Sequence, residues 1–136
     1  MEENRTGYIV TIEEAAHGGG GAKGHPGLKG YHYMKEPAIY VSLGLDMIQT
    51  GGGIQEHYHE CNVEMPVFDH IYYVISGQIR ATVGDIEKTV GPDSFIYCPS
   101  NVRHSILNVG QDAAKVLRIT GSGKGQKMGD AVYSKK

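Results

Sequence analysis

The chain has no tryptophan, only two phenylalanines and only two cysteines among its 136 residues. Cys61 and Cys98 are too few for a disulfide framework and lack the paired spacing of a cysteine zinc site. No apolar run approaches the length that a membrane-spanning helix needs. Residues 1–5 also lack the basic and then apolar regions of a signal peptide. We therefore expect a protein of the reducing cytoplasm, without a membrane partner.

An excess of charge of one sign is lacking too. Thirteen Lys and Arg stand against fifteen Asp and Glu, which gives a formal net charge of −2. A nucleic-acid-binding domain concentrates basic residues, whereas here they are scattered, so we expect no nucleic-acid partner. Hydrophobic residues make up 40% of the chain and charged residues 21%. This composition is typical of one globular domain that buries a core without disulfides.

Short segments with a period of two follow one another from residue 39 to residue 120, which predicts β-strands. The first alternates Ile39, Val41, Leu43, Leu45 and Met47 with polar residues or glycine, so we expect a half-buried strand with this apolar face toward the core. Further strands are expected at 8–12, 54–59, 70–75, 78–83, 86–90, 94–98, 104–108 and 114–120. Strands of this length, without a helical period, predict an all-β fold, an antiparallel sandwich or barrel.

Glycine is abundant, with twenty residues, and it dominates segment 18–24. Ordering glycine costs backbone entropy, which predicts a flexible segment there. We divide the chain into an N-terminal strand and Gly-rich flexible arm at 1–38, a barrel at 39–120 and a flexible C-terminal tail at 121–136. Because sheet edges need covering, the N-terminal residues should wrap the barrel or cross to a second subunit.

Four histidines stand where strands could bring them to one ion. His57 and His59 are two residues apart in an expected strand, so their side chains point the same way. His70 opens the next strand, and His104 follows the turn at 99–103. Imidazole suits Fe, Mn, Ni, Cu and Zn alike. These residues predict a site for one divalent transition metal ion without choosing the metal.

Two motifs resemble those of the cupin family. Gly51, His57, His59 and Gly77 resemble its first motif, and Gly91, Pro99, His104 and Asn108 resemble its second. The resemblance covers roughly residues 39–120. It implies a single cupin jelly-roll β-barrel of two antiparallel sheets, with a metal bound inside by residues of both motifs. It also implies a homodimer.

Two positions depart from the family pattern. His70 stands where the family usually has glutamate, while an alternative alignment gives that ligand role to Glu64. We prefer His70 because it opens a strand, whereas Glu64 lies in a loop next to Pro66. Asn101 stands where glycine is common, and asparagine tolerates the left-handed conformation that such a turn requires.

Other side chains are candidates for chemistry around the metal. Glu64 and Asp69, in the loop before His70, are candidates for a general acid or base, and Tyr72 is a candidate for the cavity wall and for catalysis. Phe95 and Tyr97 are candidates for lining the cavity, with packing in the core as the preferred role. Arg80 and Arg118 could clamp an acid, although alternation turns Arg80 outward. The other histidines, His17, His25 and His32, are expected to be structural or exposed.

An ion held by neutral imidazoles keeps its full charge, so it would attract an anionic small molecule and lower the pKa of bound water. Its affinity should fall below about pH 6, where free imidazole becomes protonated. The site predicts an enzyme for a small organic acid or enolisable carbonyl compound, dioxygenase-like by its resemblance to carboxylate-poor cupin dioxygenases. A redox-neutral isomerase, lyase or decarboxylase and a non-catalytic ligand-binding module are the alternatives.

Overall fold

The computed structural model describes residues 8–17, 25–33, 41–60, 68–122 and 131–133. These residues form eleven strands: β1 (Ala16–His17), β2 (Leu28–His32), β3 (Val41–Ile48), β4 (Gly53–His59), β5 (Phe68–Ser76), β6 (Ile79–Val83), β7 (Ile86–Val90), β8 (Phe95–Cys98), β9 (His104–Asn108), β10 (Ala114–Ser122) and β11 (Ala131–Tyr133). Within these ranges there is no helix that could cross a membrane.

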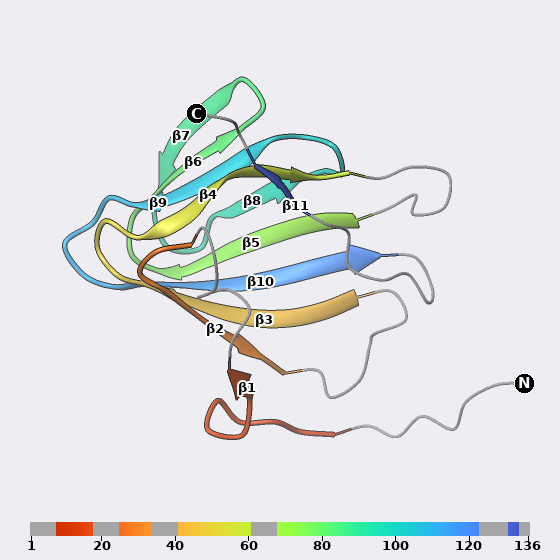
Figure 1. Cartoon of the computed structure of the whole chain (residues 1–136). Helices are drawn as coiled ribbons and strands as arrows, with labels where there is room; N and C mark the ends of the chain where they lie inside the picture. Colours follow the sequence, from red (N-terminus) through yellow and green to blue (C-terminus); the bar gives the residue numbers. More distant parts are fainter. Residues whose placement is uncertain (1–7, 18–24, 34–40, 61–67, 123–130, 134–136) are drawn as a thin grey trace, which may run out of the picture.

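The strands form two antiparallel sheets, which Figure 1 shows as two layers. One sheet has the order β1-β2-β3-β10-β5-β8, and the other has the order β11-β4-β9-β6-β7. Strands remote in sequence are neighbours: β10 pairs with both β3 and β5, and β9 pairs with both β4 and β6. The predicted all-β fold of two antiparallel sheets is confirmed.

The core lies between the inner faces of the two sheets. Each strand turns alternate side chains inward, so residues of both sheets meet there. The fully buried apolar members include Ile48, Val74, Ile79, Ala114 and Val116. The interior is therefore apolar over much of its length, which makes its few polar side chains informative.

Strand β3 turns inward the face opposite to the one that we predicted. Asp46 and Ile48 are buried, whereas Val41 and Leu43 are 48% and 39% exposed. Leu45, on the predicted face, is also buried, but it is not part of the core cluster. The pairing with β10 places Asp46 beside Val116 and Gly44 beside Arg118. The Asp46 carboxylate is neutralised there by the Arg118 guanidinium, with 3.1 Å between Nε and Oδ2. A buried carboxylate is tolerated when it is paired, so polarity alone did not identify the outer face.

Strand β8 corrects a second expectation. Phe95 and Tyr97 are 67% and 47% exposed, while Ile96 and Cys98 are buried. The register with β5 aligns Cys98 with His70 and Ile96 with Tyr72, which turns these side chains inward together. Phe95 and Tyr97 therefore belong to the outer surface and not to the core.

The chain ends add strands to the sheets. Strand β2 pairs with β3 and β11 pairs with β4, so both cover barrel strands that would otherwise be edges. The short strand expected at 8–12 is wrong: residues 8–11 form no strand, and residues 12–14 form a turn. The Gly-rich segment 18–24 and residues 123–130 lie outside the described residues.

The pairing of β4 with β9 depends on a close approach at Gly53. Gly53 is the register partner of Leu107, and a Cβ at this position would overlap the carbonyl oxygen of Ile106. Between Ile54 and His57 the register shifts by a bulge, which re-aims the side chains that follow. The approach at Gly53 and the bulge together set where His57 meets β9.

We expect Gly53→Ala to lower the free energy of unfolding by about 3 kcal/mol, because the added methyl group must displace backbone atoms. Gly91→Ala is the matched control. Its added Cβ would meet the end of the flexible Gln78 side chain at 3.0 Å, so a change within about 0.5 kcal/mol is expected. Urea unfolding of both variants measures the difference, and equal losses would contradict the prediction.

Candidate metal centre

Three histidines from two strands meet on the inner face of the five-stranded sheet. His57 and His59 lie on β4, and His104 opens β9 as the register partner of His57. One ligand atom of each lies within 4.8 Å of the other two. All three side chains are buried. This set could hold one metal ion.

Backbone carbonyls orient two of these rings. His57 Nδ1 lies 2.7 Å from the carbonyl oxygen of Gln55, and His104 Nδ1 lies 3.0 Å from that of Val102. A carbonyl only accepts, so each Nδ1 must be the N–H donor, which leaves the Nε2 lone pair for a ligand.

The surroundings of His104 Nε2 test whether a metal ion fits the site. This atom is buried and accepts no hydrogen bond from the residues that the structure describes. A buried acceptor without a partner costs about 1–3 kcal/mol. A metal ion satisfies that lone pair, so the three rings fit the divalent transition metal that the sequence predicts.

His70 faces this set from the opposite sheet. Its ring centre lies 4.7 Å from that of His59 and 6.0 Å from that of His104. Its Nδ1 lies 3.2 Å from the hydroxyl oxygen of Thr120, its register partner on β10. The three-histidine set within 4.8 Å does not include His70, but the structure brings its ring against that set.

A fifth histidine, His25, lies beside the site. From the sequence we expected it to be structural or exposed. The ring centre of His25 is 5.7 Å from that of His57. Backbone hydrogen bonds from Gly53 to Pro26 and from Gln49 to Gly27 hold this segment against the β3–β4 turn. His25 follows the Gly-rich segment, and no sequence pattern connected it with residues 57–59.

Burial keeps three of these histidines neutral. It lowers the pKa of His57 to about 4, with the charges of His104 and His25 acting in the same direction. Burial likewise lowers the pKa of His104. It holds the pKa of His70 well below its ordinary value, helped by His59 and by the charge of Arg118. Metal binding requires neutral imidazole, and these groups are neutral at pH 7.

Two further inward groups line the space near His70. The Tyr72 ring stacks on His70 with 5.8 Å between ring centres and lies 6.4 Å from His104. Tyr72 is thus buried beside the histidine cluster, and its role in the cavity wall and in catalysis stays a prediction. Arg118 binds Asp46 through Nε and through Nη2, the latter at 3.4 Å. This ion pair adds a charged group to the inner face of the six-stranded sheet.

The structure gives Asp69 a different place from the one expected of an acid or base above the metal. It alternates with His70 along β5, so the two side chains point to opposite faces. Its carboxylate accepts hydrogen bonds from the Tyr97 hydroxyl at 3.0 Å and from the Ser100 N–H and hydroxyl at 2.8 Å each. Asp69 therefore holds the turn that leads to His104. Glu64 lies outside the described residues.

The same turn contains Asn101, whose φ is 66°. The predicted left-handed asparagine is confirmed. Cys98, which precedes the turn, is buried, and burial raises the pKa of its thiol to about 12. A thiol with that pKa is not a nucleophile at neutral pH.

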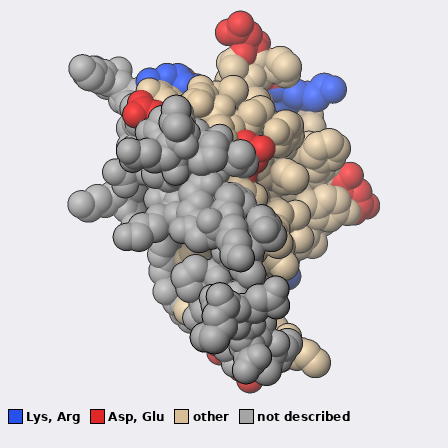
Figure 2. Space-filling model, turned by 90° about the vertical axis from the view of Figure 1, so that its right-hand side faces the viewer, with Lys and Arg blue, Asp and Glu red and all other residues tan. Residues whose placement is uncertain are grey.

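The site lies near one end of the barrel. His59 is the last residue of β4, His104 is the first of β9, and His70 is the third of β5. This is the end at the right of Figure 1, where β10 also ends. Figure 2 looks onto this end and shows described acidic and basic side chains that are separate from one another. The described surface here has no patch of one charge sign.

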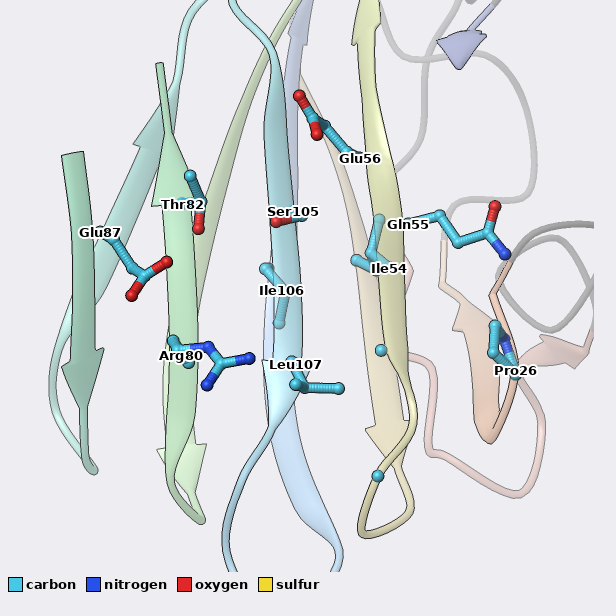
Figure 3. Close-up of a pocket in the computed structure, with 12 residues that line it drawn as sticks. Pro26, Ile54, Gln55, Glu56, Arg80, Thr82, Glu87, Ser105, Ile106 and Leu107 are labelled. Atoms are coloured by element: carbon cyan, nitrogen blue, oxygen red, sulfur yellow. The ribbon is translucent and has the colours of Figure 1, made fainter. Parts of the chain in front are cut away.

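A groove on the outer side of the five-stranded sheet is separate from the histidines. It has a volume of about 360 Å³ and is lined by residues that include Glu56, Arg80, Thr82 and Ser105. Figure 3 shows these side chains on one side of β4, β9 and β6. The outward position predicted for Arg80 is confirmed. His104 alternates with Ser105 and points the other way.

Two antiparallel sheets enclosing a buried histidine cluster define a β-barrel protein with a candidate metal site. The sequence model of the cupin domain family matches residues 44–120, which make up more than half of the chain. The chain belongs to the cupin family.

Two curated relatives from Streptomyces are similar over 75 residues. The polyketide synthase CurC of Streptomyces cyaneus is 27% identical, over 55% of this chain and 45% of its own length. Protein SchB of Streptomyces halstedii is 25% identical, over 55% of this chain and 50% of its own length. The chain spans about half the length of the curated relatives it matches.

Solved structures share the fold. The polyketide cyclase RemF of Streptomyces resistomycificus has a TM-score of 0.75 at 14% identity, covering 96% of this chain and 87% of its own. A predicted oxalate decarboxylase of Thermotoga maritima has a TM-score of 0.71 at 18% identity. The match covers 85% of this chain and 99% of the decarboxylase chain. At these identities the likeness shows the fold alone.

We expect a divalent metal ion such as Zn²⁺ to raise the melting temperature of the metal-free protein. An ion that binds only the folded state stabilises it by about 2.7 kcal/mol at one hundred times its dissociation constant, which corresponds to about 10 °C. His104→Gln should abolish most of this rise, whereas His32→Gln on β2 should keep it. Thermal unfolding with and without metal measures the shift, and an equal rise in both variants would contradict the assignment.

We also expect the metal-free protein to lose stability as the pH falls below about 6.5. The pKa of His57 is about 4 in the folded protein against 6.5 as its ordinary value. Between these values the unfolded chain binds a proton that the folded chain does not, so unfolding is favoured, by up to about 3 kcal/mol. Urea unfolding at pH 7 and pH 4.5 should show a smaller loss for His57→Gln than for the unchanged protein. An identical loss would refute the assignment to His57.

Proposed function

We propose that this protein is a metal-dependent enzyme that acts on a small, anionic, enolisable carbonyl compound without net oxidation. The observation that carries this proposal is a buried cluster of three imidazoles, a ligand group that includes no carboxylate among the described residues. Asp46 on the facing sheet is already paired with Arg118. His57, His59 and His104 would hold the ion, with His70 as the fourth ligand. A bound divalent ion supplies a Lewis acid for a carbonyl oxygen.

The neutral ligand set favours an enolate. Burial keeps the pKa of His57 and His70 low, so these rings carry no positive charge that would repel a metal ion. They also carry no negative charge that would neutralise the ion. The positive charge of the site is then available to a substrate oxygen that becomes negative during the reaction.

We propose that Arg118 orients the substrate anion. Asp46 engages Nε and Nη2, and a guanidinium has five N–H donors, so donors remain for a carboxylate or phenolate. Gly44 leaves the space that the guanidinium occupies, because a Cβ there would overlap Arg118. Asp46 thus fixes the orientation of Arg118, and Tyr72 forms the adjacent wall.

The names of two similar proteins support carbonyl chemistry of this kind. RemF is a polyketide cyclase and CurC a polyketide synthase, and polyketide chains carry enolisable carbonyl groups. A cyclase joins carbon atoms without consuming oxygen. We therefore place redox-neutral chemistry on a polyketide-like carbonyl compound ahead of dioxygenation. Dioxygenation of the same substrate class is the second candidate, favoured by the carboxylate-poor histidine site.

The test is turnover of a panel of β-diketones and aromatic polyketide-like acids by metal-loaded protein, followed by mass spectrometry with and without oxygen. We expect the same product at the same rate in both conditions. Product that forms only with oxygen would replace the proposal by the dioxygenase. Tight metal-dependent binding without turnover would make the protein a binding module.

We expect Arg118→Gln to lower kcat/KM for an anionic substrate about 100-fold, mainly by raising KM, because loss of a buried charge-assisted contact costs about 2–5 kcal/mol. Metal content should not change. Arg80→Gln, in the outer groove, is the matched control and should leave both quantities unaltered. Equal kinetics of the two variants would exclude the substrate role of Arg118.

A further inference from the structure

The groove on the outer side of the five-stranded sheet forms because the residues in the middle of that sheet are small. Ser105 on β9 has a short side chain, and Gly53 on β4, the register partner of Leu107, has none. Longer side chains stand on either side, with Glu56 on β4 and Arg80 on β6 (Figure 3). The volume of about 360 Å³ lies in the size range of small-ligand sites.

Three charged side chains converge on this groove from three strands. In Figure 3 the Glu56 side chain leans from β4 toward β9, the Arg80 guanidinium extends from β6 toward β9, and the Glu87 carboxylate turns from β7 toward β6. All three residues are exposed. None of them makes an ion pair or a hydrogen bond with another residue that the structure describes. The groove therefore presents two carboxylates and one guanidinium to a ligand.

The register of the strands fixes how these charges are arranged. Thr82 pairs with Ser105 on β9 and with Glu87 on β7, so two hydroxyl groups and one carboxylate share a row. Arg80 lies two residues before Thr82, which places it about 7 Å away along the strand. Arg80 and Glu87 are thus neighbours on the β6–β7 side of the groove, while Glu56 stands on the other side of β9.

We propose that the groove binds a small diamino carboxylic acid, the class of lysine and ornithine. The α-carboxylate pairs with Arg80 and the α-ammonium with Glu87, because these two residues are neighbours, as the two groups of the ligand are. The side-chain ammonium pairs with Glu56 across β9. A ligand with two positive groups and one negative group complements two carboxylates and one guanidinium in number and in sign.

Simpler charged molecules match the groove less well. A simple anion would pair with Arg80 but would approach two carboxylates, and like charges brought together are unfavourable. A simple diamine would leave Arg80 without a partner inside the complex. The proposal is independent of the reaction at the metal centre, because His104 alternates with Ser105 and points to the other face of the sheet.

Isothermal titration calorimetry of the full chain with L-lysine tests the proposal. Norleucine lacks the side-chain ammonium, ε-aminocaproate lacks the α-ammonium and cadaverine lacks the carboxylate. We expect saturable binding of lysine, with a dissociation constant about 5-fold lower than that of each analogue, at the upper end of the effect of one exposed ion pair. Absence of lysine binding would overturn the proposal, and so would equal binding of lysine and cadaverine.

Substitutions assign each charge of the ligand to its residue. Arg80→Gln should raise the dissociation constant of lysine about 5-fold and leave that of cadaverine unchanged, because cadaverine has no carboxylate. Glu56→Gln should weaken lysine to the same extent and leave norleucine unchanged. Glu13→Gln makes the same change at an exposed residue outside the groove and should have no effect. Equal losses in Glu13→Gln and Glu56→Gln would overturn the proposal.

Metal loading separates this groove from the histidine site. Amino and carboxyl groups are themselves metal ligands, so lysine is titrated into both metal-free and Zn²⁺-loaded protein. We expect the same dissociation constant in the two forms, since the groove and the histidines lie on opposite faces of the sheet. Lysine binding that requires Zn²⁺ would overturn the proposal for the groove while leaving the metal-dependent function intact.

Discussion

The hydrogen bonds from His57 and His104 to carbonyls two residues upstream are the constraint on which the site depends. Gln55 provides the carbonyl for His57, and Val102 provides it for His104. Because the acceptor lies in the same strand or in the turn before it, the backbone itself fixes the tautomer and the ring orientation. The antiparallel pairing of β4 with β9 then places the two rings opposite each other. Gly53 permits that pairing by bringing β4 against the backbone of β9.

The two sheets contribute different chemistry to the space between them. The five-stranded sheet supplies three imidazoles that converge on one point. The six-stranded sheet faces them with His70, Tyr72 and the Asp46–Arg118 ion pair. In a low-dielectric interior such an ion pair is stable only with good geometry. Arg118 accordingly meets both carboxylate oxygens of Asp46. A metal ligand set and a fixed cation on facing walls suit a substrate with a carbonyl and an anionic group.

The six-stranded sheet carries polar groups on its inner face and apolar side chains on its outer face. Asp46 and His70 are buried among apolar neighbours such as Val116 and Val74, while Leu43 and Phe95 lie outward. Both features follow from one register. Once β10 aligns Arg118 with Gly44 and Tyr72, the intervening residues of β3, β10 and β5 must point outward, and most of them are apolar. The buried polar groups of this sheet and its apolar outer side chains are therefore consequences of the same alignment.

The sequence by itself determined the strands between residues 39 and 120, the shared face of His57 and His59, and the left-handed turn at Asn101, because each depends on neighbours within a few residues. The position of His104 beside them followed only from a family motif. Alternation shows a period but not which side is the interior, so the outward faces of Leu43 and Phe95 were missed. Only the tertiary structure decided those faces, the ion pair of Asp46 with Arg118, and the place of His25. These depend on contacts between segments far apart in the chain, whose register no local pattern specifies.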